Sequence, residues 1–134
     1  MSQDTDTGLA CLALLARMHG VAVDPAQLAH EFAPVGAFVD ESALLRAARS
    51  TGLKAKAGRF SLAALNGMAL PAIAVGQDGR FFILARVETD TEHAPDDIQR
   101  VLIHDPLASR PEILPVAAFE ARWSGRLMLL TSRA

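Results

Sequence analysis

Apolar residues in the first part of the chain recur with helical spacing. Residues 9–16 are apolar on every side of a 3.6-residue period, a pattern typical of a helix that is enclosed by protein. Asp6 is a suitable N-cap for this helix, and Gly20 is the residue type that follows a helix C-terminus. The pattern therefore predicts a central, buried helix over residues 7–19.

Two shorter helices are predicted after the first. Asp24 followed by Pro25 is a cap and first-turn pair, and Leu28 and Phe32 are spaced to form one buried stripe. A third helix is expected over residues 40–49, where leucine and alanine alternate with arginine at helical spacing and Gly52 follows.

Beyond residue 53 the pattern changes to short apolar runs typical of strands. Residues 72–76 and 81–87 are joined through Asp78-Gly79, a strong hairpin signal, and predict an antiparallel pair. Further predicted elements are strands at 101–104 and 127–130, short helices at 62–66 and 116–122, and an exposed acidic loop at 88–97. Helices followed by an antiparallel sheet favour the α+β class.

Neighbouring residues on a strand point to opposite sides of the sheet, which matters for the aromatic pair Phe81 and Phe82. Both rings cannot enter one core face, so we expect one of them to look outward or into a cleft. Phe119 and Trp123 are four residues apart and are predicted to pack together in the core.

Composition narrows the class of protein. The 134 residues are enough for a single domain over 1–134, and 51% of them are hydrophobic. The net charge of -2 lacks the basic excess of most nucleic-acid-binding surfaces, so no nucleic-acid partner is expected. One cysteine, Cys11, cannot form an internal disulfide and favours a cytosolic location. No apolar stretch predicts a membrane-spanning helix.

Three segments together resemble the cysteine peptidase domains of bacteriocin-exporting ABC transporters. The first is Asp6-Thr7-Gly8-Leu9-Ala10-Cys11, which resembles the nucleophile helix. The second, Asp78-Gly79-Arg80-Phe81, resembles the hairpin that presents the catalytic histidine, and Ile103-His104-Asp105-Pro106 resembles the strand end that supplies the orienting aspartate. The resemblance covers most of the chain and implies a papain-like cysteine-peptidase fold, with N-terminal helices packed on an antiparallel sheet.

The chain departs from this pattern at both reacting positions. Thr7 stands where the resemblance places the cysteine nucleophile, and a hydroxyl needs a positioned base before it can attack. Phe81 stands at the histidine position and cannot transfer a proton. Asp105 is retained, but has no imidazole to orient. Gln3 is too close to Thr7 for the oxyanion role of the family's glutamine.

These losses resemble the degenerate branch of the family, in exporters of haemolysin-type and adenylate-cyclase-type repeat toxins. The resemblance implies a non-catalytic accessory domain of a type I secretion ABC transporter, on the cytoplasmic face of a bacterial inner membrane. Its implied partners are the unfolded secreted repeat protein and the remaining membrane and ATPase domains of the transporter. Thr7, Phe81 and Asp105 are then the candidate substrate-binding residues, because a peptide cleft keeps its strand edges and apolar walls after its chemistry is lost.

Other interpretations stay open at this point. An active cysteine peptidase that cleaves a leader peptide would have to use Cys11, with His104 as its base, and a purely structural transporter domain would bind no cargo. Thr7 is equally a small polar residue in a first helical turn, Phe81 a core aromatic and Asp105 a turn former. Cys11 is expected to be buried and unreactive. The four histidines lack metal-ligand spacing, and no phosphate-binding loop is present, so no metal or other cofactor is predicted.

Overall fold

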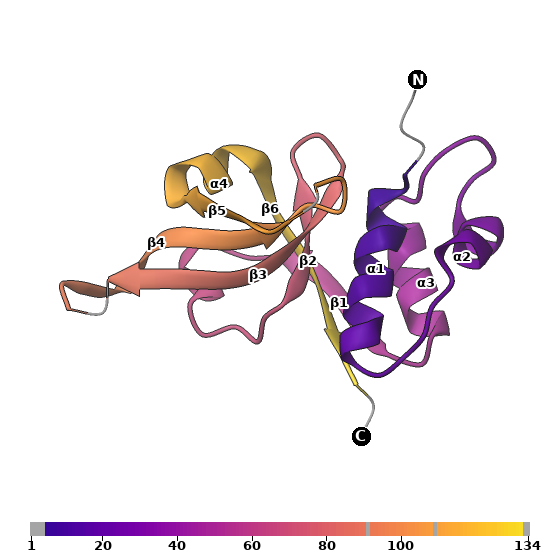
Figure 1. The fold of residues 1–134 in the computed structure, drawn as a ribbon, viewed down its shortest axis with the longest axis horizontal. Helices are drawn as coiled ribbons and strands as arrows, with labels where there is room; N and C mark the ends of the chain where they lie inside the picture. Colours follow the sequence, from indigo (N-terminus) through magenta and orange to yellow (C-terminus); the bar gives the residue numbers. More distant parts are fainter. Residues whose placement is uncertain (1–4, 91, 109, 133–134) are drawn as a thin grey trace.

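The computed structural model describes residues 5–90, 92–108 and 110–132, which form a helical layer against one end of a six-stranded antiparallel sheet (Figure 1). Three helices precede the sheet in the chain, and a fourth lies on its opposite face. This arrangement confirms the α+β class and the packing of N-terminal helices on an antiparallel sheet.

The three N-terminal helices begin where their capping residues predict. They are α1 (Thr7–Met18), α2 (Pro25–Phe32) and α3 (Glu41–Ser50). The residues that cap them are Asp6, Asp24 and Asp40, whose carboxylates each accept a backbone N–H of the first turn. The helix predicted over residues 7–19 ends one residue early, because His19 is its C-cap.

All neighbouring strands of the sheet pair in antiparallel fashion. The strands are β1 (Lys54–Arg59), β2 (Ala72–Gly76), β3 (Phe81–Asp90), β4 (Ala94–His104), β5 (Glu112–Pro115) and β6 (Trp123–Thr131). Their order is β1-β6-β2-β3-β4-β5, so the predicted β2–β3 pair lies in the middle of the sheet. A short 3-10 turn, η1 (Ala63–Leu65), replaces the helix predicted at residues 62–66.

Apolar clusters cover both faces of the sheet, and this overturns the expectation for the aromatic pair. Phe81 is 3% exposed and belongs to the cluster beneath α1 and α3. Phe82 is 2% exposed and belongs to the cluster beneath α4 (Val116–Arg122) on the other face. Neither ring looks outward, because both faces of the sheet are covered at the start of β3. The predicted pair of Phe119 and Trp123 is confirmed, with ring centroids 5.2 Å apart.

The prediction of an exposed loop over residues 88–97 is wrong. Both flanking strands extend into this segment, and β3 and β4 form a long hairpin that projects away from the helical layer (Figure 1). Glu88 lies opposite Arg100 and accepts a hydrogen bond from its Nε at 3.0 Å. Acidic residues are compatible with strands here because a projecting hairpin exposes its side chains to water and pairs them across strands.

The edge strands β1 and β5 carried no clear sequence signal. The β1 sequence, KAKAGR, lacks β-branched residues and is held by pairing with the apolar strand β6. The carbonyl oxygen of Ala55 also accepts hydrogen bonds from Nε and Nη2 of Arg49, at 3.1 and 3.0 Å. Pairing partners that are distant in the chain, and not the local composition, therefore make β1 a strand.

Candidate functional site

The N-terminus of α1 meets the start of β3 at the place where the family resemblance puts the reacting groups. Asp6 holds this end of the helix, since its Oδ1 accepts the Leu9 N–H at 3.2 Å and its Oδ2 accepts the Val39 N–H at 2.9 Å. One carboxylate thus joins α1 to the segment that leads into α3. This places Thr7, the first residue of the helix, against the sheet.

Thr7 and Phe81 are in direct contact. The Oγ1 of Thr7 accepts a hydrogen bond from the backbone N–H of Phe81 at 3.0 Å, across 74 residues of sequence. Thr7 is only 7% exposed and Phe81 only 3%. The two positions come together as the resemblance implies, and the Phe81 ring fills the apolar core beside them.

Gly8 allows this close contact between helix and strand. A Cβ atom at Gly8 would lie 2.9 Å from Cγ2 of Val39 and 3.0 Å from Cδ2 of Phe81. Both distances are shorter than ordinary carbon contacts. Glycine at this position is therefore required by the packing of α1 on the Phe81 ring.

Asp105 follows β4 directly, but its carboxylate is bound to α4. Its Oδ2 accepts a hydrogen bond from Nη2 of Arg122 at 2.6 Å, and its Oδ1 accepts the Leu107 N–H at 2.8 Å. The same guanidinium lies 4.8 Å from the centroid of the Phe82 ring. Asp105 is thus part of a turn and an ion pair on the α4 side. Sequence reasoning missed Arg122, whose position next to Trp123 gave no sign of this role.

The only cysteine lies one helical turn beyond Thr7 and is fully buried. Burial raises the pKa of the Cys11 thiol far above its ordinary value, and the negative charges of Asp105 and Asp6 raise it further. The thiolate needed for nucleophilic attack is therefore strongly disfavoured. The expectation of a buried Cys11 is confirmed.

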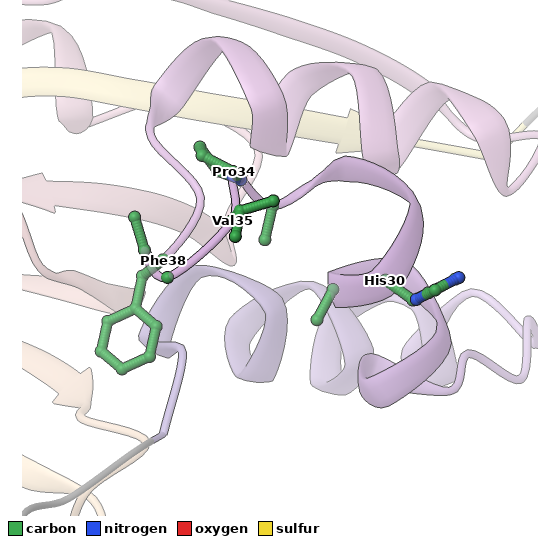
Figure 2. A pocket seen from close by; sticks show the side chains of 8 residues that line it. His30, Pro34, Val35 and Phe38 are labelled. Carbon is green, nitrogen blue, oxygen red and sulfur yellow. The ribbon is translucent and has the colours of Figure 1, made fainter.

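Two of the surface hollows involve the helical layer and are relevant to binding. The larger, of about 590 Å³, lies between α2 and the segment that follows it and is lined by residues such as His30, Pro34, Val35 and Phe38 (Figure 2). The smaller, of about 330 Å³, lies between α1 and the sheet, and we call it the α1–β4 groove. It is lined by Leu14, Arg17, Met18, Pro71, Ile83, Ala85, Leu102, His104 and Pro111.

The Thr7 hydroxyl acts as the acceptor of a backbone hydrogen bond. Within residues 5–90, 92–108 and 110–132, no hydrogen bond joins the Thr7 hydroxyl to an imidazole. The same ranges contain no cluster of three or more His, Cys, Asp or Glu side chains that could hold a metal ion. In the same ranges no helix is both long and apolar enough to cross a bilayer. Gln3 lies outside the described residues.

Comparisons with known proteins identify the family of this chain. Residues 1–134 match the Peptidase C39 family. The chain is 46% identical over 129 residues to the cyclolysin secretion/processing ATP-binding protein CyaB of Bordetella pertussis, covering 96% of this chain and 17% of that protein. The chain therefore spans about a sixth of the length of such relatives.

Two solved structures share the fold. One is the N-terminal peptidase C39 like domain of the toxin secretion ATP-binding protein from Vibrio parahaemolyticus, with a TM-score of 0.81, 23% identity, and coverage of 98% of this chain and 100% of that one. The other is a double glycine motif protease from an AMS/PCAT transporter in complex with its leader peptide, with a TM-score of 0.80, 20% identity, and coverage of 99% and 90%. By sequence match and by fold, this chain belongs to the peptidase C39 family.

Proposed function

We propose that this chain is a non-catalytic C39-like domain that docks an unfolded secreted repeat protein for export by a type I secretion ABC transporter. The observation that carries the proposal is the direct contact between Thr7 and Phe81 at the two reacting positions. A hydroxyl and a phenyl ring occupy the place where a peptidase needs a thiolate and an imidazole.

The contacts of Asp105, the retained aspartate, support the proposal that the domain is non-catalytic. An orienting carboxylate acts by holding an imidazole in the correct tautomer. The Asp105 carboxylate instead forms an ion pair with Arg122, whose side chain is 35% exposed. Asp105 therefore has a structural use that needs no catalytic partner.

The proposed role in export rests on the functions for which the relatives of this chain are named. CyaB is named for cyclolysin secretion, and another relative, 37% identical, is a toxin RTX-I translocation ATP-binding protein of Actinobacillus pleuropneumoniae. The remaining membrane and ATPase domains of such a transporter are the second proposed partner. We propose that the domain acts at the cytoplasmic face of a bacterial inner membrane, as part of such a transporter.

The proposal is tested by titrating the isotope-labelled domain with an unfolded, calcium-free Gly- and Asp-rich repeat protein. We expect localised chemical-shift changes and no cleavage of the added protein. The absence of any perturbed amide at high micromolar repeat protein would contradict docking. In a parent exporter, deletion of residues 1–134 should leave assembly intact and abolish secretion, whereas a purely structural domain would impair assembly.

The alternative of a Cys11 peptidase is tested by alkylation. Because Cys11 is buried and its pKa is raised, native protein should resist iodoacetamide at neutral pH until denaturant is added. Mass spectrometry measures the modified fraction. Rapid modification of the native chain would support the enzyme interpretation.

A further inference from the structure

The helical layer leaves part of one sheet face uncovered beside α1. The apolar cluster on this face takes its sheet residues from β1, β6, β2 and β3, and it contains Ile83 but no residue of β4 or β5. The opposite face of β4 and β5 is covered by α4. In the described ranges, the helix-side face of β4 and β5 therefore has no covering helix (Figure 1). The residues that line the α1–β4 groove place it at the boundary of this face.

The uncovered strip is apolar. Met18, at one wall of the groove, is 67% exposed. Leu102, in the groove, pairs across the strands with Ile113, so their side chains share one face, and Ile113 is 56% exposed. Contiguous exposed apolar side chains of this kind mark interaction sites.

The ionisable residues that line the groove are basic. Arg17 and His104 are the lining residues that can carry charge, and no carboxylate lines the groove among the residues described. The nearby Asp105 is already paired with Arg122 at 2.6 Å. The groove therefore combines an apolar floor with a guanidinium and an imidazole that are able to donate hydrogen bonds to an anion.

We propose that the α1–β4 groove binds an extended segment of the unfolded secreted protein in which a large apolar side chain is flanked by carboxylates. This inference rests on the proposed docking function and adds the place and the chemistry of recognition. The apolar side chain enters the hollow between Met18 and Leu102, and a neighbouring carboxylate pairs with Arg17. Charge complementarity with an Asp-rich chain selects this groove over the hollow beside Val35, whose lining contains no permanent cation.

The test compares substitutions of exposed residues at the two hollows. We would measure the dissociation constant for the calcium-free Gly- and Asp-rich repeat protein by calorimetry. Met18→Ser and Arg17→Glu should each raise this dissociation constant by about three- to tenfold. The first substitution removes part of the apolar contact, and the second removes the ionic contact. The controls are Val35→Ser, at an apolar residue of the other hollow that is more exposed than Met18, and Arg46→Glu on α3. Both are expected within about twofold of wild type.

The possible outcomes separate the two proposals. Unchanged affinity in both groove variants, with weakened binding in Val35→Ser, would overturn the groove assignment and leave the docking function in place. No binding by the wild-type chain would overturn both proposals. Weakened binding in the groove variants alone, with native circular dichroism spectra, is the result expected.

Discussion

The Oγ1 atom of Thr7 accepts a hydrogen bond at 3.0 Å from the backbone N–H of Phe81, and both residues are buried. The contact joins the first turn of α1 to the first residue of β3. This hydrogen bond satisfies a buried backbone donor. The hydroxyl therefore has a structural role whether or not cargo binds nearby.

Removal of this hydroxyl should destabilise the fold. Thr7→Val keeps the shape of the side chain but leaves the Phe81 N–H without its acceptor, at a cost of about 1–3 kcal/mol in the free energy of unfolding. Urea denaturation measures the loss. Thr7→Ser retains a hydroxyl and is the matched control, so equal losses in both variants would show that the hydrogen bond is not the cause.

Gly8→Ala should also destabilise the domain, through crowding. The added methyl group would lie 3.0 Å or less from Phe81 and Val39, and we expect a loss of about 1–3 kcal/mol in unfolding free energy. Gly58→Ala is the control, because a Cβ there meets only the Phe60 ring, at 3.5 Å. A Gly8→Ala variant as stable as Gly58→Ala would contradict the close packing of α1 on β3.

Introducing a thiol at position 7 and an imidazole at position 81 should produce an activated thiol. In the double variant Thr7→Cys, Phe81→His, the thiol and imidazole should lie within hydrogen-bonding reach, and the thiol pKa should fall below its ordinary value of roughly 8.5. The pH dependence of alkylation measures this pKa, with Thr7→Cys alone as the control. Peptidase activity is not part of this expectation, because the two substitutions do not themselves supply an oxyanion donor. An unperturbed thiol pKa would contradict the assignment of these positions.

The stability of the β3–β4 hairpin should depend on pH through the Glu88 carboxyl. Hydrogen bonds from Arg100 and Arg86 lower the pKa of the Glu88 carboxyl below its ordinary value. A lowered pKa means that the ionised form favours the folded hairpin. This contribution is present above the ordinary glutamate pKa and is lost as the pH falls through the lowered one.

A carbon-13 NMR titration of the Glu88 carboxyl checks this expectation. Arg100→Gln should move the Glu88 pKa upward, toward its ordinary value, because it removes the larger of the two contributions. Arg46→Gln on α3 is the distant control. A wild-type Glu88 that titrates at the ordinary value would mean that the segment is not paired as described, and would favour the loop expected from its composition.

The helices were predictable because their signals are local. Asp6, Asp24 and Asp40 satisfy backbone donors two or three residues away, so capping can be read from neighbouring residues. The β2–β3 hairpin was predictable for the same reason, through Asp78 and Gly79. The edge strands were not, because β1 depends on pairing with β6, some 70 residues later in the chain.

The sequence by itself determined the residue types at the positions that the resemblance assigns to the reacting groups, a threonine at position 7 and a phenylalanine at position 81. It also determined where the three capped helices begin and the family to which the chain belongs. Only the tertiary structure decided that Thr7 and Phe81 are buried together, that Asp105 pairs with Arg122, and that the sheet beside α1 is left uncovered. Each of these depends on contacts between distant segments, and burial and free surface are set by which layers the whole chain packs together.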